Sequence, residues 1–331
     1  MYKIKCLPAD FQVKETITLD AKNNGFYSYF NLKKECLGTV EALEMISDKL
    51  KIPMKNIGFA GNKDKIAITE QKISIYMGRK DFENVKIRNI SLSYIGNGQK
   101  PISLGDSDGN EFTVKLRNLG KNEVNKIRKL ENKKIRCPSL FGPQRFSKNN
   151  AEVGKYIVRK EFKKAVELIL IGTGKNEGMI EGFLSKKKNN YIGALRVIPL
   201  KTRKIYVHAY QSLMFNKIVM RFLQENKKFK KNIDVPLIGF DFDLGKIKNK
   251  KLREISKKTM DKEKLQPRDF VISQMPELTS EGTMRNLFFD FRYRILEIAK
   301  DELNGSKEKA VVNFTLPKSC YATVAISCLF S

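Results

Sequence analysis

Apolar and polar residues alternate along several short stretches of this chain, which is the pattern of strands with one buried face. Residues 4–15 predict an opening strand, and residues 57–60 and 72–77 predict two strands that flank a turn at Gly61. The same alternation recurs in three later stretches, at 112–116, 287–294 and 312–316. Both ends of the chain therefore predict a sheet.

Helical spacing of apolar residues appears between these strands and dominates the middle of the chain. It predicts helices over 40–50, which Thr39 is placed to cap, and over 122–132. In the middle it predicts helices at 151–160, 161–171 and 207–224. We expect an α+β fold in which one domain, residues 1–150 with 277–331, is interrupted by an inserted domain at 151–276.

The charge of the chain is strongly positive, with 64 Lys and Arg residues against 36 Asp and Glu residues, a formal net charge of +28. Residues 151–276 hold 29 of the basic and 13 of the acidic residues. Such an excess indicates a polyanionic partner, although basic runs also occur on surfaces that only face solvent. The candidate contacts to phosphates of such a partner are Lys227, Lys228, Lys230, Lys231, Lys250, Lys251 and Arg253.

Other features of the sequence exclude several classes of protein. No apolar run approaches the roughly 18 residues of a membrane span, and no secretory signal is visible, so we expect a cytoplasmic protein. The five cysteines are widely separated and His208 is the single histidine, which argues against a disulfide framework and the usual zinc sites. Residues 172–175 lack the rest of a phosphate-binding loop. We therefore expect no metal and no cofactor.

The candidate for chemistry is Asp64, which stands between Lys63 and Lys65 just after the turn at Gly61. Ammonium groups on both sides favour the ionised carboxylate. An exposed carboxylate of this kind can serve as a nucleophile or a base, while the alternative is a loop that only faces solvent.

Two further segments are candidates for a binding site. Residues 137–146 contain one glycine and two prolines, which predicts a loop that presents Phe141 and Phe146 beside Gln144 and Arg145. Aromatic rings on a loop can stack on a nucleobase, and an arginine can pair with phosphate, although both rings could equally be part of a core. Residues 209–216 place polar groups at helical spacing, where they could brace a site.

These motifs together resemble the TruD family of pseudouridine synthases, in its archaeal type. The segment Gly61-x-Lys63-Asp64-Lys65-x-Ala67-x-Thr69-x-Gln71 is similar to the family's catalytic motif. Other family motifs are also present, and all of them occur in the family's order along the chain. They are Ile4-Lys5-x-x-Pro8-x-Asp10-Phe11-x-Val13-x-Glu15, Phe141-Gly142-x-Gln144-Arg145-Phe146, Gln211-Ser212-x-x-Phe215-Asn216, and Leu316-Pro317 with Tyr321-Ala322-Thr323.

The resemblance implies a pseudouridine synthase core, a mixed and mainly antiparallel sheet flanked by helices, with an inserted RNA-binding domain. It implies an isomerase that turns uridine into pseudouridine in tRNA, with uridine 13 the best-known target, after the base is flipped out of its stack. Asp64 would be the catalytic carboxylate, Lys5 its ion partner and Phe141 the ring that stacks on the target base. The supporting residues would be Lys63, Thr69, Gln71, Gln144 and Arg145.

One position departs from the family pattern, because Ser139 stands where the family usually has an asparagine. A serine spans less distance than an asparagine, so we expect no specific role for it. The rival interpretation is a non-catalytic RNA-binding or RNA-chaperone protein, with DNA binding a third. The oligomeric state is left open, with a monomer favoured.

Overall fold

The computed structural model describes residues 1–22 and 24–330, and the chain divides into two compact units. The first unit comprises Met1–Arg136 and Asp290–Ser331, and the second comprises Cys137–Phe289. The second unit extends beyond the insertion expected at 151–276 at both of its ends, and it includes the loop that carries Phe141. Within residues 1–22 and 24–330, no helix is both long and apolar enough to span a membrane.

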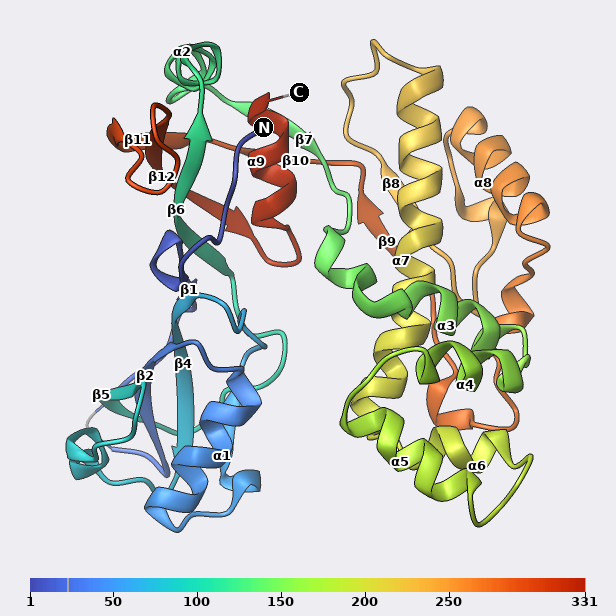
Figure 1. The fold of residues 1–331 in the computed structure, drawn as a ribbon, viewed down its shortest axis with the longest axis horizontal. Coiled ribbons are helices and arrows are strands. Elements are labelled where there is room, and N and C mark those ends of the chain that lie inside the picture. The colour runs from blue at the N-terminus through green and yellow to red at the C-terminus, as the bar shows by residue number, and fades with distance from the viewer. Residues whose placement is uncertain (23, 331) are drawn as a thin grey trace. The chain divides into compact units, whose positions relative to one another are not determined.

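An eight-stranded sheet forms the first unit (Figure 1). The strands follow the order β11 (Tyr293–Lys300), β12 (Glu308–Pro317), β6 (Gly109–Leu119), β1 (Phe11–Thr16), β4 (Ile68–Tyr76), β2 (Tyr27–Glu35) and β5 (Ile90–Gly98), and β3 (Ile57–Phe59) pairs with β4. The pair of β1 with β4 is parallel, and the neighbouring pairs of these strands are antiparallel. This mixed, mainly antiparallel sheet confirms the expected fold class.

The parallel pair positions the candidate site. Gln12 of β1 lies beside Ile68 of β4, so the two strands begin at the same edge of the sheet. The segments that lead into them, which carry Lys5 and Asp64, therefore meet at that edge although 59 residues separate them. Two motifs that are distant in sequence become one site through strand pairing alone.

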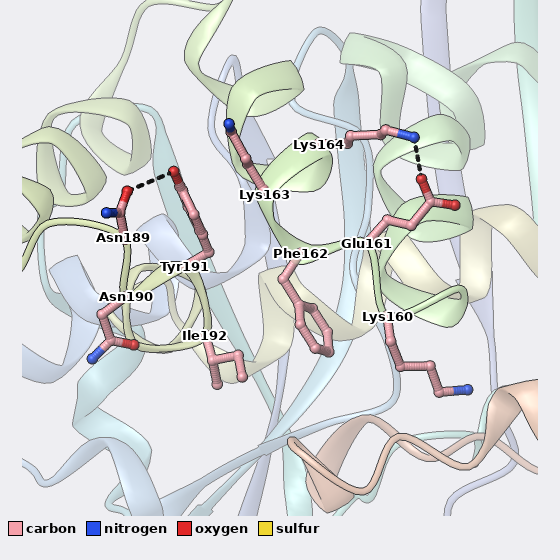
Figure 2. A pocket seen from close by; sticks show the side chains of 9 residues that line it. All are labelled: Lys160, Glu161, Phe162, Lys163, Lys164, Asn189, Asn190, Tyr191 and Ile192. Atoms are coloured by element: carbon pink, nitrogen blue, oxygen red, sulfur yellow. Dashed lines mark hydrogen bonds and ion pairs between the residues drawn. The ribbon is translucent and has the colours of Figure 1, made fainter.

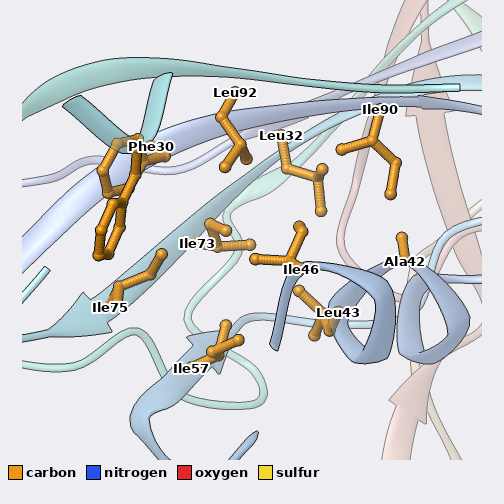
Figure 3. Packing of buried hydrophobic residues seen from close by; sticks show 11 residues of the cluster. Phe30, Leu32, Ala42, Leu43, Ile46, Ile57, Ile73, Ile75, Ile90 and Leu92 are labelled. Carbon is orange, nitrogen blue, oxygen red and sulfur yellow. The ribbon is translucent and has the colours of Figure 1, made fainter. Parts of the chain in front are cut away.

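Helices cover the sheet of the first unit and complete its core. These helices are α1 (Thr39–Leu50), α2 (Lys121–Leu130) and α9 (Ala322–Phe330). Leu43 and Ile46 of α1 pack against the inward faces of β2 and β4, where Leu32 and Ile73 are fully buried (Figure 3). Because α1 is anchored on these strands, its first turn is held close to the loop that leads into β4.

The second unit is mainly helical and is organised around α7 (Leu200–Glu225) (Figure 1). The other helices are α3 (Asn150–Val158), α4 (Phe162–Leu170), α5 (Lys175–Leu184), α6 (Tyr191–Arg196) and α8 (Lys250–Lys262). The remaining strands form two pairs, β7 (Ile135–Pro138) with β10 (Phe288–Phe291) and β8 (Asp234–Leu237) with β9 (Thr283–Asn286). A Cβ at Gly154 of α3 would lie 1.9 Å from the carbonyl oxygen of Tyr206, so only glycine lets α3 pack this closely on α7.

Two sequence expectations differ from the structure for identifiable reasons. The opening strand begins at Phe11 and not at residue 4, because Pro8–Asp10 form a 3₁₀ turn that buries Asp10 against Arg117. Thr39 begins α1 but does not cap it, because the Glu41 carboxylate accepts the hydrogen bond from the Gly38 amide. The Thr39 hydroxyl is bound instead to the loop that precedes β4.

Candidate active site

Asp64 lies in the irregular segment between β3 and β4, and its side chain is 21% exposed. The Lys5 ammonium lies 3.1 Å from its Oδ2 atom, and the same ammonium lies 4.0 Å from the centroid of the Phe11 ring. Lys5 has a φ of 57°, a left-handed backbone that costs energy in a lysine and is kept where the surroundings require it. The expected exposed carboxylate is therefore a half-buried one, held in a defined ion pair.

A second lysine reaches the same residue from β2. Lys34 is 1% exposed, and its ammonium donates to the carbonyl oxygen of Asp64 at 3.1 Å and to that of Leu37 at 2.5 Å. The pKa of Lys34 is lowered to about 8, chiefly by burial; Asp64 and Glu41 act to raise it and Lys63 acts to lower it. A lysine with a pKa near neutrality beside a candidate carboxylate is typical of a functional site.

Sequence reasoning missed Lys34, although a signal was present. In β2, Leu32 and Lys34 are both buried while Lys33 between them is exposed, so Lys34 occupies a position of the inward face. A lysine at an inward position of an otherwise apolar strand face is unusual, because burying an unpaired charge is costly.

The lysines that flank Asp64 bind other carboxylates. The Lys63 ammonium pairs with the buried Glu15 carboxylate, which also accepts a hydrogen bond from the Lys72 amide. Lys65 pairs with Glu41 at 3.0 Å. The two neighbours therefore do not contact the Asp64 carboxylate; Lys5 pairs with it, and Lys34 binds the backbone carbonyl oxygen of the same residue.

A short chain of hydrogen bonds fixes the loop in place. The Lys63 amide donates to the Thr39 hydroxyl, which donates to Gln71 Oε1, and Gln71 Nε2 donates to the carbonyl oxygen of Gly61. Lys63, Thr39 and Gln71 therefore act on the backbone around Asp64. Thr69 is fully buried, and its hydroxyl has no hydrogen-bond partner in the part of the chain that the structure describes.

The aromatic loop belongs to the second unit and is braced by α7. The Asn216 side chain accepts a hydrogen bond from the Phe141 amide and donates one to the Phe141 carbonyl oxygen, each at 2.9 Å. The expected brace from residues 209–216 is therefore present. The Phe141 ring is 8% exposed, lies edge-on to Phe215, and has the Arg285 guanidinium 4.6 Å from its centroid.

Arg285 is a second residue that sequence reasoning missed. Its Nε atom donates to the carbonyl oxygen of Ser139 at 3.0 Å, and the amide of Ser139 donates to Leu287. Ser139 thus takes part through its backbone, which any residue could supply. Arg285 lies on β9, far from the aromatic loop in sequence, and the two come together only in the folded chain.

The other predicted residues of the second unit are more peripheral. Arg145 donates to the Ser212 hydroxyl and lies 5.6 Å from the Phe141 ring centroid, while Gln144 is exposed. Burial lowers the pKa of His208, and Arg145 and Lys204 lower it further, so its imidazole is neutral at pH 7. The seven basic residues expected to contact RNA are all exposed, but Arg253 donates to the carbonyl oxygen of Ile247.

Comparison with known proteins gives consistent matches along the chain. The family model for tRNA pseudouridine synthase D (TruD) matches residues 2–181, 176–235 and 224–327. The chain is 29% identical to tRNA pseudouridine synthase D of Aquifex aeolicus, covering 99% of this chain and 98% of that protein. A crystal structure from Methanosarcina mazei, assigned to tRNA pseudouridine synthase D (TruD), matches with a TM-score of 0.72 and 25% identity over 99% of this chain and 93% of that one.

The sheet and these matches define the class of the protein as a pseudouridine synthase. Such an enzyme is an isomerase, which rearranges the bonds of its substrate without adding or removing atoms. Within that class, the chain belongs to the TruD family.

Proposed function

We propose that this protein converts uridine 13 of tRNA into pseudouridine in the cytoplasm, with Asp64 as the catalytic carboxylate. The observation that carries the proposal is the ion pair between Lys5 and Asp64, which unites two family motifs in one half-buried site. The relatives named tRNA pseudouridine synthase D support tRNA as the substrate.

The reaction breaks the bond from N1 to C1′, rotates the uracil, and forms a bond from C5 to C1′. The proton on C5 is lost and N1 gains one, so atoms and charges balance without an added reagent. A carboxylate can take part by attack on C1′, by addition to the base, or by removal of the C2′ proton. All three routes need an ionised Asp64 with one free oxygen, and Lys5 binds Oδ2 only.

Lys5 and Lys34 have complementary tasks in this proposal. Lys5 orients the carboxylate through its side chain, whereas Lys34 holds the backbone of the same residue. Both place an ammonium group close to the residue that carries the proposed chemistry. Lys63, Thr39 and Gln71 keep the loop rigid, because a displaced carboxylate would lose the geometry that the reaction requires.

The target base has to leave its stack, which costs a few kcal/mol that contacts with the protein must offset. We propose that the second unit supplies these contacts. The Phe141 ring is buried under the Arg285 guanidinium, so a base would stack on Arg285 or take its place over the ring, and the exposed lysines at 227–231 and 250–251 offer charge to the phosphates.

The experiment is to incubate the protein with an unmodified tRNA transcript and to map pseudouridine at nucleotide resolution. A matched transcript with cytidine in place of uridine 13 is the control. The proposal expects one pseudouridine, at position 13, in the first transcript and none in the second. Modification at another position would reject the assigned target, and binding without any modification would favour the rival RNA-binding protein.

A further inference from the structure

A cavity of about 560 Å³ lies wholly within the second unit, between the first turn of α4 and the segment that leads into α6. Its volume is in the range of roughly 300–1,000 Å³ that small-molecule sites occupy. Figure 2 shows residues 160–164 on one side and residues 189–192 on the other. None of its lining residues belongs to the unit that carries Asp64.

The lining of this cavity combines apolar surface with polar groups. Phe162 and Ile192 supply apolar surface, and the half-buried ring of Tyr191 lies beside them. The Tyr191 hydroxyl donates to Asn189 Oδ1 at 3.1 Å and so does not depend on a ligand for its hydrogen bond (Figure 2). Asn190 Oδ1 accepts from the Gly193 amide, and its NH₂ group can still donate to a ligand.

Positive charge surrounds the cavity, and one lysine is suited to a ligand. The ammonium of Lys160 donates to the carbonyl oxygen of Asp269, and that of Lys164 pairs with Glu161. Lys163 makes only a long contact of 3.8 Å to Glu167, and its side chain is 65% exposed. An anionic group at the rim would find this ammonium largely uncommitted.

These groups match the chemistry of an unpaired RNA nucleotide. An aromatic face stacks on a base, amides bind the base edge, and an ammonium neutralises the adjacent phosphate. The surrounding stretch, residues 151–276, holds 29 basic against 13 acidic residues, so charge complementarity selects a polyanion over a neutral or basic partner, and the aromatic face selects a nucleic acid among polyanions.

We propose that this cavity binds one unpaired nucleotide of the RNA substrate, other than the target uridine, with its base on Tyr191 and its phosphate at Lys163. The proposal rests on the proposed function, since it takes tRNA as the ligand. The site would add affinity and select RNAs that have an unpaired nucleotide at the right distance from the target.

The test measures binding of the full-length protein to an unmodified tRNA transcript at several salt concentrations. Tyr191→Ala should weaken binding about tenfold, since it removes one stacked base, while Tyr191→Phe should keep the affinity of the wild type. Lys163→Gln should reduce the slope of log K against log salt by about 0.7 to 0.9, the loss of one phosphate contact. Lys129→Gln, an exposed lysine of α2, is the charge-matched control and should change neither.

Steady-state kinetics on the same variants provide a second readout. Tyr191→Ala should raise KM with an unchanged kcat, since the cavity holds no reacting group. Wild-type binding by both Tyr191→Ala and Lys163→Gln, or an equal loss in Tyr191→Phe and Tyr191→Ala, would overturn the proposal. A wild-type protein that forms no pseudouridine, yet binds tRNA through Tyr191, would reject the proposed function and leave this site standing.

Discussion

The buried ammonium of Lys34 lies 3.1 Å from the backbone carbonyl oxygen of Asp64, the candidate catalytic residue. Lys34 lies beside Thr69 in the antiparallel pairing of β2 with β4, so it reaches the edge of the sheet at which β1 and β4 begin. Three strands therefore contribute to one carboxylate site. Lys34 thus places a buried positive charge beside Asp64. The lowered pKa of this lysine makes both activity and stability depend on pH.

The first prediction concerns activity at alkaline pH. Burial lowers the pKa of Lys34 to about 8, so above that pH the residue loses the charge that supports the Asp64 carboxylate. Wild-type kcat should therefore decline as the pH rises through about 8. Lys34→Arg should remove this decline, because a guanidinium stays charged. A decline of the same size in Lys34→Arg would show that another group titrates.

The second prediction concerns stability, which should change in the opposite direction. The pKa of Lys34 is lower in the folded protein than its ordinary value of 10.5, so between pH 8 and 10.5 the unfolded chain binds more protons. The free energy of unfolding should therefore rise across this window, by up to roughly 3 kcal/mol at about 1.36 kcal/mol per pKa unit. Urea unfolding at several pH values measures this free energy. In Lys34→Met the free energy of unfolding should not rise across the same window.

The third prediction separates Lys5 from the lysines that flank Asp64. Lys5→Gln removes the ion partner of Asp64 Oδ2 and should lower kcat about 100-fold. Lys65→Gln removes a lysine adjacent in sequence but paired with Glu41, and should keep kcat within about twofold of the wild type. Equal effects of the two variants would mean that the lysines act through general charge and not through the observed pair.

The fourth prediction concerns the buried ion cluster of the first unit. Arg117 is fully buried and binds Asp10 and Asp301, and the hydrogen bonds that it donates to Asp10, Glu302 and Asp301 raise its pKa. Arg117→Met would remove the guanidinium that neutralises two buried carboxylates and should lower the free energy of unfolding by about 3–5 kcal/mol. Arg136→Gln, which breaks a more exposed pair with Asp290, should cost at most about 1 kcal/mol. Urea unfolding compares them, and similar losses would contradict the account.

The sequence allowed a large part of this picture to be predicted, because period-two alternation and the spaced motifs are local signals. The strands at both ends of the chain and α7 follow from these periodicities, whereas the mixed sheet and the pairing of Lys5 with Asp64 were implied by the resemblance to the TruD family that the spaced motifs carry. The partners of the lysines could not be predicted in the same way. Lys63 and Lys65 flank Asp64 in an irregular segment, yet their ammonium groups bind Glu15 and Glu41, and no local spacing in the sequence indicates these partners.

Tertiary packing also decided details that local rules assign differently. Thr39 has the side chain of a helix cap, yet its hydroxyl binds the Asp64 loop because α1 packs on the sheet beside it. Arg285 covers the Phe141 ring from a strand more than a hundred residues away, and no spacing in the sequence announces that contact. Such contacts join residues that are far apart in sequence, so they depend on the tertiary structure.

The most direct test of the account is pseudouridine formation by Asp64→Asn on an unmodified tRNA transcript. The amide keeps the shape of the carboxylate and leaves the backbone contact with Lys34 in place, so tRNA affinity and urea unfolding should match the wild type. With the charge removed, pseudouridine formation should fall by about 10⁴-fold or more. Activity within tenfold of the wild type would contradict the central claim that the ionised Asp64 carries the reaction.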